Sequence, residues 1–293
     1  MIKQPLLLLL FLCSPLAYAK YKDYSDPLAR RLLVLASSAY SPTPHDCLGN
    51  RFENAELIER FEIHCDLSEN NTCSGYIALL HQDRVIAVVF RGTTSKDQLG
   101  LEGVSGFFER GYFQEMGRVN RYFQDAFEKI WDGGMGKRFD EISQNYPDYD
   151  LWVTGHSLGG ALASLASAHI VSSKPKYTDQ NSAHYSFGQP RVGDEQFSSS
   201  HSKLIPWYYR VTHAHDIVVG LFPAYLGYQH HVNEVWYNNA MLPGDSYKIC
   251  RKPWDWKCIK VPIPLPNMID HRHYFNVKIT TYGKTGCLKE IHA

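Results

Sequence analysis

One serine stands among glycines where an apolar run gives way to small residues: segment 151–166 reads LWVTGHSLGGALASLA. A Gly-X-Ser-X-Gly pattern between a strand and a helix forces its serine into a tight, strained turn, which leaves the hydroxyl exposed at the top of a sheet. Side chains at Gly155, Gly159 and Gly160 would collide in such a turn. The first helical turn also leaves unpaired backbone N–H groups beside the hydroxyl, ready to bind negative charge. The pattern therefore predicts that Ser157 is a nucleophile.

A nucleophilic serine needs a base, and the base needs an acid that holds its tautomer; in α/β-hydrolases the chain order is Ser, then Asp or Glu, then His. Asp216 ends the strand-like YYRVTHAHD, where a carboxylate would emerge at the strand's C-terminal edge. Asp194 is better interpreted as a turn or helix-cap residue, and Asp245 and Asp255 lie in a proline-rich segment. The candidate bases are His213, His215, His230, His231, His271 and His273. Periodicity alone leaves the choice of base open.

The segments around these residues alternate between strand and helix patterns. Strands are predicted at 76–80, 85–90, 151–154, 185–188, 208–212 and 234–237, the first two flanking a turn. A helix with one apolar face is predicted from Val119, Tyr122, Phe123, Ala126, Phe127 and Ile130, and a second helix at 161–171. Strands that alternate with helices indicate an α/β layered domain.

The first residues have the pattern of a secretory signal peptide. Lys3 precedes the apolar run Leu6 to Leu12, which is too short to span a bilayer, and Ala17-Tyr18-Ala19 is a small-residue cleavage pattern. Cleavage after Ala19 would leave one domain over 20–293. No second long apolar stretch follows, so we expect a secreted protein without a transmembrane anchor, outside the cell or in the lumen of a digestive organelle.

Charge and histidine spacing exclude several classes of partner. Lys plus Arg and Asp plus Glu number 30 each, with no long block of one sign, so we expect no nucleic-acid surface. The pairs His230-His231 and His271-X-His273 match no common metal site, and we predict neither a metal nor a cofactor. A monomer is the expected oligomeric state.

Cysteines suggest a disulfide framework. Six remain after the loss of Cys13, and an even number in a secreted chain favours disulfides. Fifteen connectivities are possible for six cysteines. The simplest pairs Cys65 with Cys73 and Cys250 with Cys258, which leaves Cys47 to join Cys287. Asn70 begins a glycosylation sequon inside the Cys65–Cys73 loop, which would have to face solvent.

Five segments resemble the class 3 lipases, the filamentous-fungal-type triacylglycerol lipase family of the α/β-hydrolase fold. They are VVFRGTTS at 88–95, VTGHSLGGALASLAS at 153–167, FGQPRVGDEQF at 187–197, RVTHAHDIV at 210–218 and DHRHYF at 270–275. The resemblance implies a central, mostly parallel sheet flanked by helices, and the three disulfides paired as above. It implies Ser157 as nucleophile, Asp216 as acid and His271 as base, the histidine of a His-X-X-Tyr-Phe motif.

The resemblance also implies an oxyanion hole, the pair of N–H donors that stabilises a tetrahedral intermediate. Thr93 and Leu158 should supply these donors, each commonly worth about 3 kcal/mol. Arg91 is interpreted as a structural residue paired near the strand end. After Ser95 the resemblance places a lid with Leu99, Leu101, Val104, Phe107 and Phe108 on its apolar side. Four glycines in that stretch disfavour a stable helix, so an irregular loop is the alternative.

These patterns predict a secreted serine hydrolase of carboxylic esters, and the resemblance implies a lipase that acts on triacylglycerols at a lipid–water interface through an acyl-enzyme. A phospholipase or an esterase for small esters would use the same site. A non-catalytic lipid-binding protein on the same scaffold is the rival from another class. An intact Ser, Asp and His set favours the enzyme.

Overall fold

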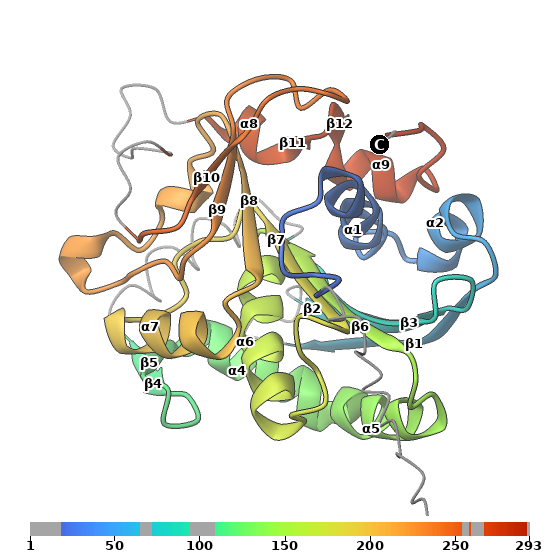
Figure 1. Ribbon diagram of the computed structural model, residues 1–293, viewed down its shortest axis with the longest axis horizontal. Coiled ribbons are helices and arrows are strands. Elements are labelled where there is room, and N and C mark those ends of the chain that lie inside the picture. Colours follow the sequence, from blue (N-terminus) through green and yellow to red (C-terminus); the bar gives the residue numbers. More distant parts are fainter. Residues whose placement is uncertain (1–18, 65–71, 94–108, 254–257, 259–266, 292–293) are drawn as a thin grey trace, which may run out of the picture.

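The molecule is built on an eight-stranded sheet with the strand order β1-β2-β3-β6-β7-β8-β9-β10 (Figure 1). The computed structural model describes residues 19–64, 72–93, 109–253, 258 and 267–291. The strands are β1 (Ala55–His64), β2 (Thr72–Leu80), β3 (Val85–Phe90), β6 (Asp150–His156), β7 (Ser182–Phe187), β8 (Tyr208–His213), β9 (Glu234–Tyr237) and β10 (Lys248–Cys250).

The five central strands run parallel, and antiparallel strands close both edges of the sheet. β3, β6, β7, β8 and β9 pair in parallel, whereas β1, β2 and β10 pair antiparallel with their neighbours. Parallel neighbours require crossover connections, and helices supply most of them. The predicted α/β-hydrolase architecture, a mostly parallel sheet flanked by helices, is confirmed.

Alternating side chains along β3 divide the interior into two cores. Val85, Ala87 and Val89 pack into one core, and Ile86, Val88 and Phe90 pack into the other, all of them fully buried. A strand with apolar residues on both faces belongs in the middle of a sheet covered on both sides. Burying one such large side chain contributes about 1.5 to 3 kcal/mol.

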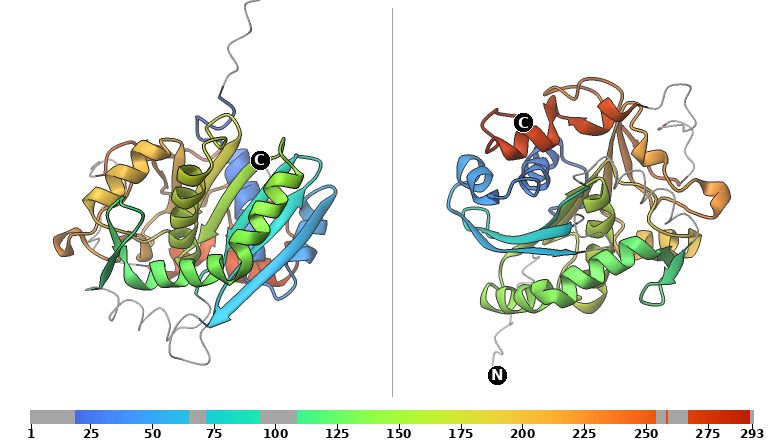
Figure 2. Two further views of the ribbon diagram at one scale, coloured as in Figure 1. Left: turned by 90° about the horizontal axis from the view of Figure 1, so that it is seen from below. Right: turned by 180° about the vertical axis from the view of Figure 1, so that it is seen from behind.

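Helices cover both faces of this sheet (Figures 1 and 2). On one face lie α1 (Asp26–Ser38), α2 (Pro44–Arg51) and α9 (Ile279–Lys284), and on the other lie α4 (Arg121–Ile130), α5 (Gly136–Asn145), α6 (Leu158–Ser173) and α7 (Glu195–Leu204). None of these helices, nor any other in the described part of the chain, is long and apolar enough to cross a membrane.

The first predicted helix begins two residues later than its apolar pattern suggested. Val119 belongs to the short strand β5 (Arg118–Asn120), which pairs with β4 (Arg110–Tyr112). Asn120 then caps α4 by accepting a hydrogen bond from the Phe123 amide at 3.3 Å. The side chain of Val119 still reaches the core from β5. Its apolar character therefore predicted its burial correctly, but the assignment to a helix was wrong.

Two of the three predicted disulfides are present. Cys47 in α2 is bonded to Cys287 beyond α9, and Cys250 is bonded to Cys258. The first bond ties the N-terminal helices to the C-terminal segment, which lies beside them (Figure 1).

Four other predictions fall wholly or partly outside the described residues. Cys65 and Asn70, the lid segment 99–108 and most of the signal peptide 1–19 belong to the parts of the chain that the structure does not describe. The Cys65–Cys73 bond, the glycosylation site, the lid and the signal peptide therefore stay predictions.

Candidate active site

Ser157 connects β6 to α6 in a strained turn. Its φ and ψ are 60° and −127°, a conformation that L residues rarely adopt. Such strain costs about 1 to 3 kcal/mol and persists only where surrounding contacts hold it. One of these contacts is the hydrogen bond that the Ser157 amide donates to the Phe187 carbonyl oxygen, at the end of β7, over 2.9 Å.

The glycines around Ser157 are required by close backbone contacts. A Cβ atom at Gly155 would lie 2.1 Å from the Gly159 carbonyl oxygen, and one at Gly159 would lie 2.3 Å from the Phe90 carbonyl oxygen. Neither site accepts a side chain without moving the backbone. At Gly160 the nearest atom would be 3.2 Å away, so this site is crowded but less restrictive. The predicted collisions are confirmed for the first two glycines.

Ser157, His271 and Asp216 form one hydrogen-bonded series. His271 Nε2 lies 2.9 Å from Ser157 Oγ, and His271 Nδ1 lies 2.9 Å from each Asp216 carboxylate oxygen. All three side chains are buried. His271 comes from the short helix α8 (Met268–Arg272), and Asp216 follows β8 near the C-terminal edge of the sheet. The structure therefore brings together the three residues that the sequence singled out.

Asp216 is held as a carboxylate by its neighbours. The Tyr274 hydroxyl donates to Oδ2 over 2.7 Å, and the Val218 amide donates to Oδ1 over 2.8 Å. Burial alone would raise the pKa of Asp216, but His271 and the Tyr274 hydroxyl outweigh burial and hold this pKa below its usual value. An ionised Asp216 accepts a hydrogen bond from the N–H at His271 Nδ1, which leaves Nε2 free to accept the proton of Ser157.

Gly188 allows this carboxylate and histidine to meet, a role that the sequence analysis did not assign to it. Its φ is +57°, and a Cβ atom there would lie 2.7 Å from Asp216 Oδ2 and 3.0 Å from His271 Nδ1. Any side chain at position 188 would displace both groups. Its place directly after β7, in the FGQPRVG stretch, is a signal that sequence reasoning could have used.

The two predicted oxyanion donors lie near the elbow. Leu158 is the first residue of α6, where backbone N–H groups have no partner within the helix. Gly92, the neighbour of Thr93, packs so closely that a Cβ atom would lie 2.5 Å from the His156 carbonyl oxygen. The loop 91–93 therefore lies against the residue that precedes Ser157.

Arg91 has a structural role, as predicted. Its guanidinium donates to Glu62 Oε1 at 3.2 Å, to Thr72 Oγ1 at 2.8 Å and to the Thr72 carbonyl oxygen. These contacts join the end of β3 to β1 and β2, and the side chain is buried among them.

Two side chains beside the base were not predicted. The His156 ring stacks on the His271 ring, with centroids 4.6 Å apart, and its Nε2 lies 2.8 Å from the His271 carbonyl oxygen. His156 Nδ1 lies 2.7 Å from the Tyr40 hydroxyl. His156 is the X residue of the Gly-X-Ser-X-Gly pattern, which any residue type satisfies, so the pattern did not mark it.

The other candidate acids and bases have contacts elsewhere. Asp194 caps α7 by accepting from the Phe197 amide at 2.9 Å, and Asp245 accepts from the Leu242 amide at 2.7 Å. Asp255 lies outside the described residues. His213, His215, His230, His231 and His273 bond to groups other than Ser157 or Asp216. Within the described ranges, no cluster of three His, Cys, Asp or Glu side chains is arranged to hold a metal ion.

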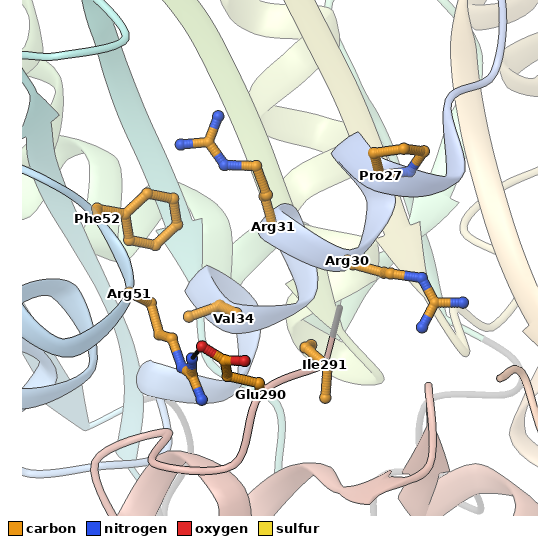
Figure 3. Close-up of a pocket in the computed structure, with 8 residues that line it drawn as sticks. All are labelled: Pro27, Arg30, Arg31, Val34, Arg51, Phe52, Glu290 and Ile291. Atoms are coloured by element: carbon orange, nitrogen blue, oxygen red, sulfur yellow. Dashed lines mark ion pairs between the residues drawn. The ribbon is translucent and has the colours of Figure 1, made fainter. Parts of the chain in front are cut away.

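A separate pocket, whose lining does not include Ser157, lies between α1 and the C-terminal segment (Figure 3). Arg30, Arg31 and Arg51 line it together with Pro27, Val34, Phe52, Glu290 and Ile291. Arg30 pairs with Asp26, Arg31 with Asp83 and Arg51 with Glu290. Because each guanidinium already has a carboxylate partner, the pocket offers little uncompensated charge for a ligand.

Comparisons with known proteins agree with this geometry. Residues 87–226, which include Ser157 and Asp216, match the family model described as Lipase (class 3). Lipase ZK262.3 of Caenorhabditis elegans is 35% identical over 317 residues, which cover 96% of this chain and 88% of that protein. A secreted mono- and diacylglycerol lipase of Fusarium solani is 35% identical over 108 residues, 36% of this chain and 31% of that protein.

The fold also matches a solved structure. The triacylglyceride lipase of Rhizomucor miehei superimposes with a TM-score of 0.73 at 23% identity, over 88% of this chain and 97% of that chain. At this identity the match concerns the fold, and it places the elbow on the same type of scaffold.

Proposed function

The chain belongs to the class 3 lipase family and is a serine hydrolase of carboxylic esters; from this premise we propose that it is a secreted lipase that hydrolyses triacylglycerols through a covalent acyl-enzyme. The single observation that carries the mechanism is the hydrogen-bonded series Ser157, His271 and Asp216. The triacylglyceride lipase of Rhizomucor miehei, which shares the fold, supports the choice of substrate.

Acylation begins at Ser157. His271 Nε2 accepts the proton of the Ser157 hydroxyl as Oγ attacks the ester carbonyl carbon, and the carbonyl oxygen becomes an oxyanion. The Thr93 and Leu158 amides donate to that oxyanion, which stabilises the tetrahedral intermediate more than the ground state. The bond to the alcohol oxygen then breaks, and His271 gives its proton to the departing alcohol. The acyl group remains on Ser157.

Deacylation repeats these steps with water. His271 Nε2 takes a proton from water as the water oxygen attacks the acyl carbon, and a second oxyanion forms between the same donors. The bond to Ser157 Oγ then breaks, the fatty acid leaves, and His271 returns the proton to the serine. Asp216 stays ionised throughout and stabilises the transient imidazolium of His271, because the Tyr274 and Val218 donors keep its negative charge favourable.

Secretion is supported by the N-terminal sequence and by the disulfides. The Cys47–Cys287 and Cys250–Cys258 bonds suit an oxidising compartment, and the Fusarium solani relative is named a secreted lipase. Expression in a secreting eukaryotic host should yield a protein in the medium whose first residue is Lys20. Retention inside the cell with residues 1–19 intact would contradict secretion.

A substrate panel tests the proposed activity. The purified protein should release fatty acid from emulsified triacylglycerol faster than from phospholipid vesicles, and Ser157→Ala should abolish both activities. Mono- and diacylglycerols form a second candidate substrate class, because the Fusarium solani relative carries that name. Turnover of phospholipid above all glycerides, or of short soluble esters alone, would replace the triacylglycerol proposal with a phospholipase or a small-ester esterase.

A further inference from the structure

We propose that Tyr40 and His156 are positioning residues for the proposed reaction: they connect the loop of the oxyanion donor Thr93 to the backbone of the base His271 and keep the base aligned on Ser157. This inference rests on the proposed function. The hydrogen bonds of these two side chains go to each other and to the His271 carbonyl oxygen, so their effect on the rate would pass through the position of His271.

The hydrogen bonds of His156 fix its tautomer. Its Nε2 lies 2.8 Å from the His271 carbonyl oxygen, and a carbonyl oxygen only accepts, so Nε2 carries a hydrogen. In a neutral ring Nδ1 is then an acceptor, and it receives the hydrogen of the Tyr40 hydroxyl over 2.7 Å. Both nitrogens are therefore satisfied only while the ring is neutral and oriented in this one way.

The environment keeps His156 neutral. Its side chain is buried, and burial together with the adjacent His271 lowers the pKa of His156 to about 3. When His271 takes the proton of Ser157, the stacked ring beside it does not compete for that proton. A neutral N–H donor thus holds the His271 backbone through the whole cycle, whichever protonation state the base is in.

Tyr40 extends the connection to the oxyanion loop. Its hydroxyl is buried and lies against the backbone of Gly92, next to Thr93. A Cβ atom at Gly92 would lie only 2.0 Å from this hydroxyl oxygen, so the two groups are in direct contact. The Gly92 backbone therefore packs on the Tyr40 hydroxyl, which hydrogen bonds to His156 Nδ1, and His156 Nε2 in turn donates to the His271 carbonyl oxygen.

This second attachment matters because the side-chain contacts of His271 hold its ring and do not by themselves hold its backbone. Asp216 fixes the Nδ1 edge of the ring, and α8, which carries the histidine, has only five residues. The bond from His156 fixes the main chain at the same residue. With both ends attached, Nε2 stays 2.9 Å from Ser157 Oγ. A displacement of about 1 Å in such a group can reduce the rate about 100-fold.

Substitutions of His156 separate positioning from packing. His156→Met introduces an apolar side chain of similar length and removes both hydrogen bonds. His156→Gln replaces the ring with an amide, which still offers one N–H donor and one acceptor. On a short soluble ester, we expect His156→Met to lower kcat about 10- to 100-fold with KM changed less than about 2-fold. His156→Gln should recover most of that loss. Rates are divided by the concentration of Ser157 that a fluorophosphonate labels. Unfolded protein, whose Ser157 is not labelled, therefore does not lower the measured kcat.

Tyr40→Phe tests whether Tyr40 acts through His156. Loss of one hydrogen bond of about 1 kcal/mol predicts a roughly 5-fold fall in kcat. In the His156→Met background, Tyr40→Phe should have no further effect, because the acceptor it would orient is already gone. Tyr177→Phe is the matched control. Tyr177 lies beyond the C-terminal end of α6, whereas Ser157 precedes the N-terminal end, and the Tyr177 hydroxyl contacts Ser143 in α5. It should leave kcat unchanged even if it lowers stability.

Several outcomes would overturn the inference. Equal kcat in wild type and His156→Met, equal losses in the Met and Gln variants, or a fivefold effect of Tyr40→Phe in both backgrounds would each show that the pair does not position His271. An increase in KM at constant kcat would point to substrate binding instead. A wild-type protein that neither hydrolyses any ester nor reacts with the fluorophosphonate would overturn the proposed function itself, which is a separate result.

Discussion

Tyr274 and His271, three residues apart, both contact the Asp216 carboxylate, one through a hydroxyl at 2.7 Å and the other through Nδ1 at 2.9 Å. Asp216 is fully buried, and an isolated carboxylate in such a place would be strongly destabilised. The same short segment therefore supplies the base and one of the donors that keep its acid ionised. A sequence in which the tyrosine follows the histidine at this spacing carries both functions together.

The nucleophile can be tested directly. A fluorophosphonate probe should label Ser157 covalently in the wild type, because His271 Nε2 lies within hydrogen-bond distance of its Oγ. Ser157→Ala should abolish labelling and lower ester hydrolysis by several orders of magnitude. Mass spectrometry of the labelled peptide and a titrimetric assay measure the two effects. Wild-type turnover by the alanine variant would remove Ser157 from the mechanism.

The choice between the two histidines of DHRHYF gives a second prediction. His271→Ala should be nearly inactive, because Asp216 and Ser157 would lose the group that joins them. His273→Ala should keep measurable turnover, since the His273 ring contacts the Ile269 carbonyl oxygen and not the acid. The two variants are well matched, because each removes one imidazole and the two positions are only two residues apart. A reversed order of activities would transfer the role of base to His273.

Sequence patterns located the central parts of this site because each depends on local geometry. The elbow needs glycines next to Ser157, and the acid and base follow it in the order expected for the scaffold. The FRGTT and DHRHYF segments identified Thr93 and His271 by family resemblance, which spacing alone could not do. The strand pairs and α6 were similarly predictable, because their apolar patterns repeat over many residues.

The missed residues depend on contacts between distant segments. Tyr40 follows α1 and reaches His156, which is 116 residues away, so no local pattern marks it. His156 occupies a variable place in its motif, and only the approach of His271 from the C-terminal segment makes its Nε2 useful. Gly188 is required because Asp216 and His271 converge above it. Packing of α1 and α8 around the sheet determines all three roles.

The long-range disulfide provides a third prediction. Replacing both Cys47 and Cys287 with Ser should lower the free energy of unfolding by about 2 to 5 kcal/mol, towards the lower end because this chain is larger than most disulfide-dependent domains. The loss is expected because the bond closes a loop across most of the chain and restricts the unfolded state. Urea unfolding of the variant and the wild type measures the difference. Unchanged stability would show that the bond adds nothing to the contacts of α1, α2 and α9.

Buried histidines predict how stability depends on pH. Burial lowers the pKa of His156, His184 and His201 to about 3, and it lowers the pKa of His230 and His231 well below the usual value. In the unfolded chain these groups titrate near 6.5. Between about pH 6.5 and 3 the unfolded state binds more protons, so the folded state is fully favoured above this window and loses stability as the pH falls through it.

Each such histidine removes up to about 1.4 kcal/mol per pH unit inside that window. We therefore expect the urea midpoint to be constant from pH 8 to 7 and to fall clearly from pH 6 to 5. His201→Phe should flatten this decline, because it keeps an aromatic ring stacked on His231 and removes one site of proton uptake. His45→Gln is the control, since His45 is exposed and should not alter the slope. A midpoint independent of pH down to 5 would contradict the prediction, whereas a steep fall would favour a neutral extracellular medium over an acidic lumen as the site of action.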